Sequence, residues 1–305
     1  MRPAASRVGS AAASQLLAYA VEHLVVGLQV RVADLAVQLD YLLELGGCSA
    51  ELAARDPMLD LRLLRDRRFT VAAGAIALAY FALFGTMFLV TQYLQLVVGY
   101  TPLRAGLTSL PMSVAMMTLA PQVPKMVRRV GAARVIPPGL GAVSVALAGF
   151  SQLGVRSAIW AVAGCLLLLG IGISATGAPL TAVLMSAVPP ERAGIGSAMN
   201  DASRELGGAL GVAILGSLLT SSYSAALWPA LTGLTGTARQ AADGGLAGAL
   251  NVAHHLPAST SGALTTAAKA AFVHGLSAAT LTAASLALCA AIAIFCLLPR
   301  SGHSR

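Results

Sequence analysis

Acidic residues are scarce in this sequence: Asp and Glu together contribute 12 of its 305 residues. Between Asp66 and Glu191 there is no acidic residue, and most of the chain after Arg68 consists of long runs without any charge. These runs cover residues 69–103, 105–124, 135–155, 157–190, 206–238 and 270–299. A bilayer core about 30 Å thick needs about 20 helical residues to cross it, so each run is long enough to span. A spanning backbone must satisfy its own hydrogen bonds, so repeated runs of this length predict membrane helices.

The sequence also lacks the residue patterns of an enzyme, a metal site or a nucleic-acid surface. There is no HExxH, GxSxG or phosphate-binding loop, and no set of residues to which catalytic roles could be assigned. The adjacent pair His254 and His255 has no third ligand, and the four cysteines (Cys48, Cys165, Cys289 and Cys296) lack metal-ligand spacing. Basic residues lie in short segments between apolar runs, away from aromatic clusters. We therefore expect no enzyme activity, no metal or other cofactor and no nucleic-acid partner.

The apolar runs predict an all-α membrane protein that crosses the lipid bilayer with six transmembrane helices. The spans are expected at about 69–98, 105–125, 135–154, 158–188, 193–222 and 270–298. One long external loop is expected at 223–268, with short helices near 237–253 and 260–270. No cleavable signal peptide is evident, because the first run long enough to span begins at Phe69.

Basic residues flank the expected spans unevenly. Positive residues favour the cytoplasmic side, and placing the segment before Phe69 there gives a consistent alternation. The cytoplasmic set is then Arg62, Arg65, Arg67, Arg68, Lys125, Arg128, Arg129, Arg134, Arg192, Arg300 and Arg305. The outer set is smaller and contains Arg104, Arg156, Arg239 and Lys269. We expect a multi-pass protein of the cell membrane with both ends of the six-helix unit in the cytoplasm.

Residues 1–55 differ in character from the rest of the chain. From Glu22 onward, charges interrupt the apolar residues too often for a span, so the plain interpretation is an amphipathic surface helix over roughly 14–45. The other interpretation is an anomalous start, produced by a frameshift or a truncated gene. Both interpretations place a domain boundary before a six-helix transmembrane domain at 56–305.

Several stretches after residue 55 resemble a known family. Residues 56–69 (DPMLDLRLLRDRRF) resemble a cytoplasmic lead-in to a helix, and residues 99–106 (GYTPLRAG) resemble a turn between two helices. Residues 194–211 contain an Asn…Arg…Gly-Gly pattern, and Arg129, Gly131 and Arg134 resemble a degenerate loop motif. Together these stretches resemble the carboxyl-terminal half of a 14-helix drug:proton antiporter of the major facilitator superfamily. The resemblance implies a major-facilitator half-bundle and a chain without the amino-terminal bundle and linker helices.

One stripe on the first span is a candidate wall of a substrate cavity. Tyr80, Phe84, Met87, Thr91 and Gln95 follow one another at helical spacing and share one face. Aromatic rings, a thioether and polar tips suit amphiphilic organic molecules. Ordinary helix packing is the alternative interpretation.

The only charges expected inside a span are Asp201, Arg204 and Glu205. Ionisable groups in a membrane are costly and are functional candidates. Asp201 and Arg204 are three residues apart and can pair, and Arg204 lies about 16 Å along the helix if it begins near Ala193. With Asn200, these residues are candidates for a gating or inter-helix salt bridge, and proton carriage is the alternative. Gly207 and Gly211 should permit close approach of another helix.

The resemblance implies proton-coupled efflux of drugs or of hydrophobic or cationic metabolites. Substrate and protons would then be the partners, and a second half-transporter or a homodimer would complete the molecule, because alternating access needs two bundles. The alternative is a membrane remnant or interaction subunit that does not transport.

Overall fold

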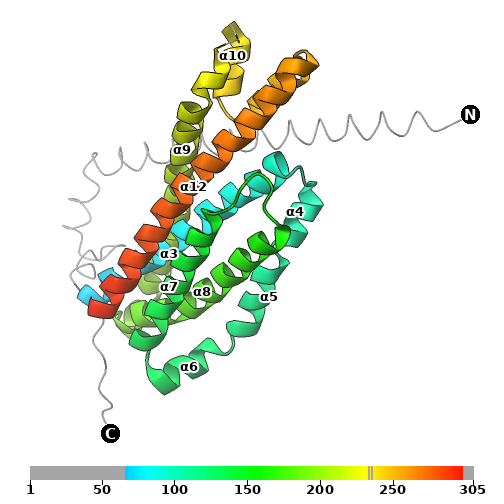
Figure 1. Ribbon diagram of the computed structural model, residues 1–305. Coiled ribbons are helices and arrows are strands. Elements are labelled where there is room, and N and C mark those ends of the chain that lie inside the picture. The colour runs from blue at the N-terminus through cyan, green and yellow to red at the C-terminus, as the bar shows by residue number, and fades with distance from the viewer. Residues whose placement is uncertain (1–65, 233, 235, 298–305) are drawn as a thin grey trace, which may run out of the picture. The chain divides into compact units, whose positions relative to one another are not determined.

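The computed structural model describes residues 66–232, 234 and 236–297 (Figure 1). All of these residues belong to the unit Asp60–Arg305. The N-terminal segment 1–55, with its expected helix, lies outside the described residues and stays a prediction. Within the described part every regular element is a helix, which confirms the all-α prediction.

Five helices of the described part are long and apolar enough to cross a membrane. They are α3 (Arg67–Gln92) with its continuation η2 (Tyr93–Val97), α7 (Ala132–Phe150), α8 (Ile159–Ser186), α9 (Ala193–Leu227) with the short turns η3 (Pro190–Arg192) and η4 (Trp228–Leu231), and α12 (Ala258–Leu297). Asp66 starts α3 because its side chain accepts a hydrogen bond of 2.7 Å from the Arg68 amide. The chain is thus built as a multi-pass membrane protein.

The span expected at 105–125 is not one continuous helix. It is divided into α4 (Pro102–Thr108), α5 (Leu110–Leu119) and α6 (Val123–Val130). Prolines explain the breaks, because proline has no amide hydrogen and its ring clashes with the preceding turn. Pro111 follows the first break, Pro121 lies in the second, and Pro124 is in the first turn of α6. Five of the six expected spans therefore correspond to helices long and apolar enough to cross a membrane, and residues 105–125 do not form one such helix.

The region expected to be an external loop with short helices near 237–253 and 260–270 is mostly helical, as that expectation indicated. Helix α9 continues to Leu227, α12 already begins at Ala258, and α10 (Gly236–Asp243) and α11 (Leu246–His254) lie between them. A small apolar core holds this region together; its buried members include Tyr223, Leu227, Leu231, Ala242, Leu246, Ala249 and Leu264. The Tyr223 hydroxyl also donates to the Ala242 carbonyl over 3.1 Å. Small and polar residues made this segment resemble a loop, yet their spacing buries one helical face.

Helix α3 lies at the centre of the bundle and packs against α9, α8 and α12. Its contact with α9 is close because α9 offers glycines to it. A Cβ atom at Gly207 would lie 2.2 Å from the Ala77 carbonyl oxygen, and one at Gly211 would lie 2.3 Å from that of Phe81. The expected role of these glycines in close helix approach is thereby confirmed, and the two helices run parallel. Helices α7 and α12 are joined by a hydrogen bond of 2.8 Å from Ser144 Oγ to the Ala284 carbonyl.

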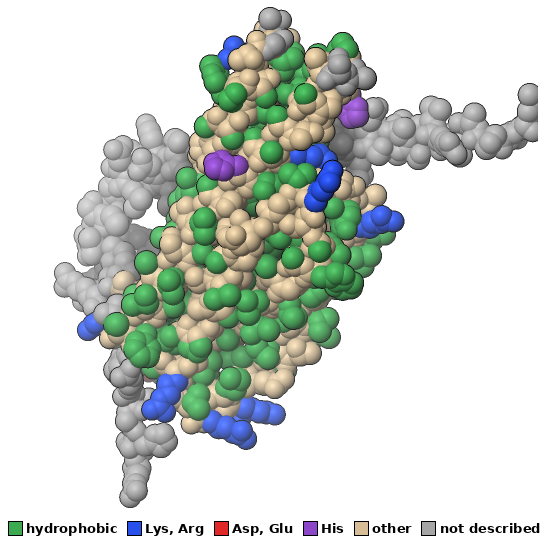
Figure 2. Space-filling model, viewed as in Figure 1, with side chains coloured by type: hydrophobic (Ala, Val, Ile, Leu, Met, Phe, Trp, Pro, Cys, Tyr) green, Lys and Arg blue, Asp and Glu red, His purple; other side chains and the backbone are tan. Residues whose placement is uncertain are grey.

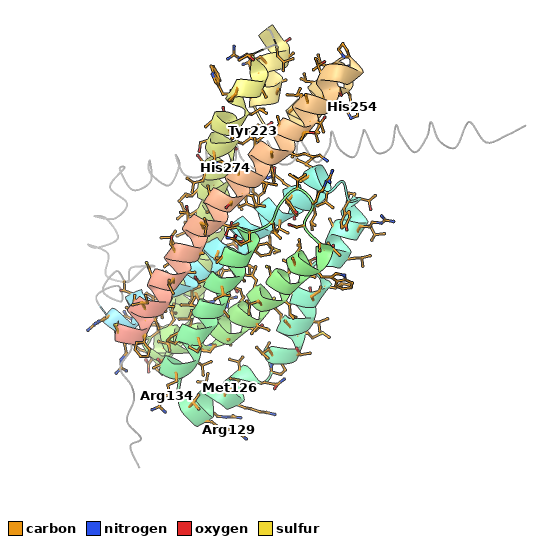
Figure 3. The ribbon with its side chains drawn as sticks, viewed as in Figure 1. Met126, Arg129, Arg134, Tyr223, His254 and His274 are labelled. Atoms are coloured by element: carbon orange, nitrogen blue, oxygen red, sulfur yellow. The ribbon has the colours of Figure 1, made fainter. Side chains whose placement is uncertain are left out.

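Charged side chains gather toward the ends of the bundle, whereas hydrophobic ones cover its middle on the face that Figure 2 shows. Figure 3 places Arg129 and Arg134 at one end, and Tyr223 and His254 toward the opposite end. The chain beginnings of α3, α7 and α9 lie at the first end (Figure 1). Basic residues were assigned above to the two membrane sides by alternating from one span to the next. The helix ends that this assignment groups together also lie together in the fold (Figure 1).

Candidate functional site

The predicted stripe lies on the one face of α3 that its neighbours do not cover completely. Phe84 is 45% exposed and Thr91 is also exposed, whereas Phe81, Leu83 and Leu89 on the other faces are buried. Tyr80, Met87 and Gln95 are partly buried. The residues at stripe positions are therefore available for contact with a molecule or with another bundle.

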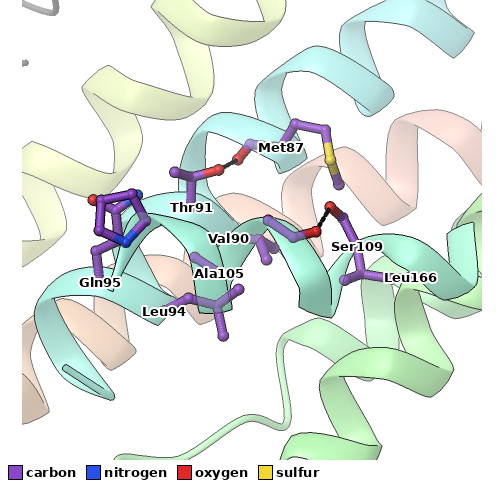
Figure 4. A pocket seen from close by; sticks show the side chains of 10 residues that line it. Met87, Val90, Thr91, Leu94, Gln95, Ala105, Ser109 and Leu166 are labelled. Carbon is purple, nitrogen blue, oxygen red and sulfur yellow. Dashed lines mark hydrogen bonds between the residues drawn. The ribbon is translucent and has the colours of Figure 1, made fainter. Parts of the chain in front are cut away.

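Three stripe residues line a pocket between α3, α4 and α8 (Figure 4). The lining consists of Met87, Val90, Thr91, Leu94, Gln95, Pro102, Ala105, Gly106, Ser109 and Leu166. Its volume is about 170 Å³, which is smaller than the roughly 300–1,000 Å³ of sites for drug-sized molecules. The pocket in the described part of the chain is therefore too small to enclose a drug-sized molecule by itself.

Polar groups in the pocket differ in how they are satisfied. Thr91 Oγ1 donates to the Met87 carbonyl over 2.7 Å, and Ser109 Oγ donates to the Gly106 carbonyl over 2.6 Å. Both hydroxyls thus bond to carbonyls three or four positions earlier in the chain. The Gln95 side-chain amide makes no hydrogen bond with the described residues, so it is the polar group that can bind a ligand without losing a partner.

Gln95 lies in the π-helical turn η2, which ends α3. π-helical turns are rare and frequently occur at functional sites. Two distant groups hold this turn: Lys269 of α12 donates through Nζ to the Val97 carbonyl over 2.8 Å, and the Tyr93 hydroxyl donates to the Gly154 carbonyl over 2.7 Å. Sequence reasoning had counted Lys269 only as an outer-side charge. The sequence feature that could have indicated this role is that Lys269 is the one formally charged residue in α12.

Tyr80 and Phe84 lie outside the pocket, and Tyr80 contacts the candidate gating residue Arg204. The Arg204 guanidinium carbon is 5.1 Å from the centre of the Tyr80 ring, and the Tyr80 and Phe84 ring centres are 5.9 Å apart. A Cβ atom at Gly208 would lie 2.6 Å from the Phe84 ring. The structure thus brings together two sets of residues that the sequence had indicated separately.

The expected pairing of Asp201 with Arg204 is absent from this conformation, as far as the described residues show. Arg204 Nη2 instead donates to Thr181 Oγ1 over 3.2 Å, and its buried Nε has no hydrogen-bond partner. The Thr181 hydroxyl donates to Asn200 Oδ1 over 2.9 Å, and Asn200 Nδ2 donates to Asp201 Oδ1 over 3.2 Å. Arg204 and Asp201 are therefore linked through Thr181 and Asn200. Glu205 is exposed on α9.

The loop-motif residues form the sharp connection between α6 and α7. Gly131 has φ +86°, a backbone conformation that favours glycine. Arg129 and Arg134 are exposed on either side of it. Among the described residues, no group of three or more His, Cys, Asp or Glu side chains is placed to hold a metal ion.

Comparison with known proteins places the chain among membrane transporters. The sequence model of the family described as Major Facilitator Superfamily matches residues 8–212. Multidrug resistance protein Stp of Mycobacterium tuberculosis is 40% identical over 181 residues, covering 59% of this chain and 34% of Stp. Multidrug efflux pump LfrA of Mycolicibacterium smegmatis is 32% identical over 238 residues, covering 78% of this chain and 47% of LfrA.

A relative with lower sequence identity is likewise matched over only part of its length. Multidrug export protein EmrB of Escherichia coli is 29% identical over 192 residues, which cover 57% of this chain and 34% of EmrB. The chain thus matches between about a third and half of the length of these curated relatives. They are multidrug efflux pumps of the 14-helix group, which confirms the resemblance drawn from the motifs.

Proposed function

Because the chain belongs to the Major Facilitator Superfamily, a family of transporters and not of enzymes, we propose that it supplies one half of a proton-coupled efflux transporter. Its substrates would be drugs or hydrophobic and cationic metabolites. The names of Stp, LfrA and EmrB support this proposal, since each describes multidrug resistance, efflux or export. The function would be exercised in the cell membrane with both ends of the helical unit in the cytoplasm.

The observation that carries the proposal is the stripe on α3. Its aromatic, thioether, hydroxyl and amide side chains lie on an incompletely covered face, and Met87, Thr91 and Gln95 line the pocket. Transporters of this kind bind substrate near the bilayer midplane between two halves. The small pocket volume of about 170 Å³ favours a site that a second bundle completes. That bundle would be a separately encoded half or a second copy of this chain.

The broken helix would complete the membrane unit. Residues 102–119 contain α4 and α5, which pack along α8 and at the η2 turn. We take this pair as the sixth crossing, interrupted at Ser109. Membrane helices tolerate such breaks where neighbouring groups or local turns satisfy the freed backbone, and here the Met112 amide donates to the Ser109 carbonyl over 3.1 Å.

Arg204 would act as a gating residue. It connects α9 to Tyr80 on α3 and to Thr181 on α8, so a change in the angle between these helices must break or remake its contacts. The contacts of the Arg204 guanidinium with the Tyr80 ring and the Thr181 hydroxyl could be replaced by other contacts when the bundle moves. The alternative of proton carriage rests on Asp201 and Glu205, which lie one turn apart on the same helix.

Efflux of ethidium from intact cells tests the proposal. Cells would express the chain alone, or together with the amino-terminal half of LfrA, and dye accumulation would be measured with and without an uncoupler. We expect lower accumulation in at least one arm, reversed by the uncoupler. Phe84→Ala should weaken extrusion, whereas Leu288→Ala, an exposed position on α12 outside the pocket, should not.

Accumulation equal to that of empty-vector cells in both arms, with the protein present in membranes, would contradict the proposal. That result would favour the alternative of a membrane remnant or interaction subunit. Extrusion that survives the uncoupler would support transport and contradict proton coupling.

A further inference from the structure

Helix α6 is short and strongly amphipathic. Lys125, Arg128 and Arg129 lie on one side of the helix, because residues three and four positions apart share a face. Val123, Met126, Val127 and Val130 occupy the opposite side. Arg134 follows shortly after, beyond the turn at Gly131, and is exposed like the three basic residues of α6.

The apolar side of α6 is only partly used by the protein itself. Val123 is fully buried and Val127 is half-buried, where α6 packs against α7 and α8. Met126 is 47% exposed and Val130 is 44% exposed. A helix with apolar residues left open on one side and cations on the other suits the boundary between hydrocarbon and headgroups.

The position of α6 agrees with such a boundary. It lies at the end of the bundle where the long helices α3, α7 and α9 begin (Figure 1). Figure 3 places Met126, Arg129 and Arg134 together at this end. The surrounding chain adds little negative charge, since residues 67–190 contain no Asp or Glu. Asp66 and Glu191, just outside that range, belong to the connections before α3 and after α8.

We propose that α6 and Arg134 form a binding surface for anionic phospholipid headgroups in the adjoining leaflet. The cations Lys125, Arg128, Arg129 and Arg134 would contact the phosphates, while Met126 and Val130 would insert among the first acyl carbons. Clusters of basic residues beside membrane helices attract anionic lipid in this way. This surface is separate from the pocket, so the proposal does not depend on transport.

Quenching of a fluorophore at Met126 by brominated lipid tests the proposal. The four native cysteines would be replaced by serine, and Met126→Cys would be labelled with bimane in the full chain reconstituted in bilayers. Brominated phosphatidylglycerol and brominated phosphatidylcholine would be compared at the same mole fraction. A basic side chain near the surface favours anionic lipid by about fivefold, so quenching by phosphatidylglycerol should exceed quenching by phosphatidylcholine by about that factor. High salt should reduce the ratio.

Two comparisons separate specific binding from a general surface effect. Leu288→Cys, an exposed position on α12 far along the chain from Lys269 and Arg300, should be quenched about equally by both lipids. Arg128→Gln with Arg129→Gln should remove most of the preference at position 126, whereas Arg128→Lys with Arg129→Lys should retain it. Equal quenching by the two lipids at position 126 would overturn the proposal, as would a preference that survives the double glutamine substitution.

Discussion

At the scale of single residues, Arg204 departs most from the sequence-based expectation. Its spacing from Asp201 allowed an ion pair, but spacing along a helix fixes only which residues can meet. The side chain instead reaches Tyr80 and Thr181 on other helices. These partners lie far from it in the sequence, so no local pattern indicated them.

Arg204→Ala should impair transport and leave membrane insertion intact. The substitution removes the stacking on Tyr80 and the hydrogen bond to Thr181. A cation–π contact removed from water contributes about 2 kcal/mol, so the efflux rate should fall by up to roughly thirtyfold. The measurement is dye efflux normalised to the amount of protein in the membrane. Loss of the protein from the membrane would instead assign Arg204 a role in folding.

At the scale of elements, the contact between α3 and α9 was predictable because small residues four positions apart have a direct packing meaning. The break in the expected span at 105–125 was harder to predict. Membrane helices contain prolines both with and without a break: α8 continues through Pro179, whereas the chain is broken next to Pro111. Neighbouring contacts decide between these outcomes, and the sequence alone does not specify them.

Gly211→Ala should destabilise the bundle by forcing α3 and α9 apart. The new Cβ atom would lie 2.3 Å from the Phe81 carbonyl oxygen, which is backbone and cannot rotate away. Overpacking of this kind costs about 1–3 kcal/mol. Thermal unfolding in detergent measures the effect. Gly164→Ala is the matched control, since no neighbouring atom lies within 4 Å of its added Cβ, and an equal loss in both variants would contradict the explanation.

Lys269→Met should loosen the π-helical end of α3. Methionine keeps much of the length of the side chain but cannot donate to the Val97 carbonyl, whose hydrogen bond spans 172 positions in the sequence. Amide hydrogen exchange at residues 94–100 should become faster, because an unsatisfied helix end opens more readily. Lys269→Arg should preserve the protection. Unchanged exchange in the methionine variant would mean that Lys269 does not hold this turn.

At the scale of the whole molecule, composition and charge pattern were enough to predict helical membrane architecture. The alternating basic segments also agree with which helix ends lie together (Figure 1). In the region at 223–268 the structure has helices where the sequence predicted them, near 237–253 and 260–270, but α9 and α12 extend further into it than expected. The helical spacing of the stripe residues was enough to place them on one face of α3. Only the fold shows that Met87, Thr91 and Gln95 line the pocket while Tyr80 contacts Arg204.

The central claim is that the exposed face of α3 forms one wall of a substrate cavity. The most direct measurement is alkylation of Thr91→Cys in native membranes, in a background without other cysteines, by a water-soluble maleimide. Thr91 is exposed and lines the pocket, so ethidium should slow its reaction, whereas Asn251→Cys, an exposed position on α11 outside the pocket, should react at a rate that dye does not change. If ethidium leaves the Thr91→Cys rate unchanged at saturating concentration, this face does not bind substrate and the account is contradicted.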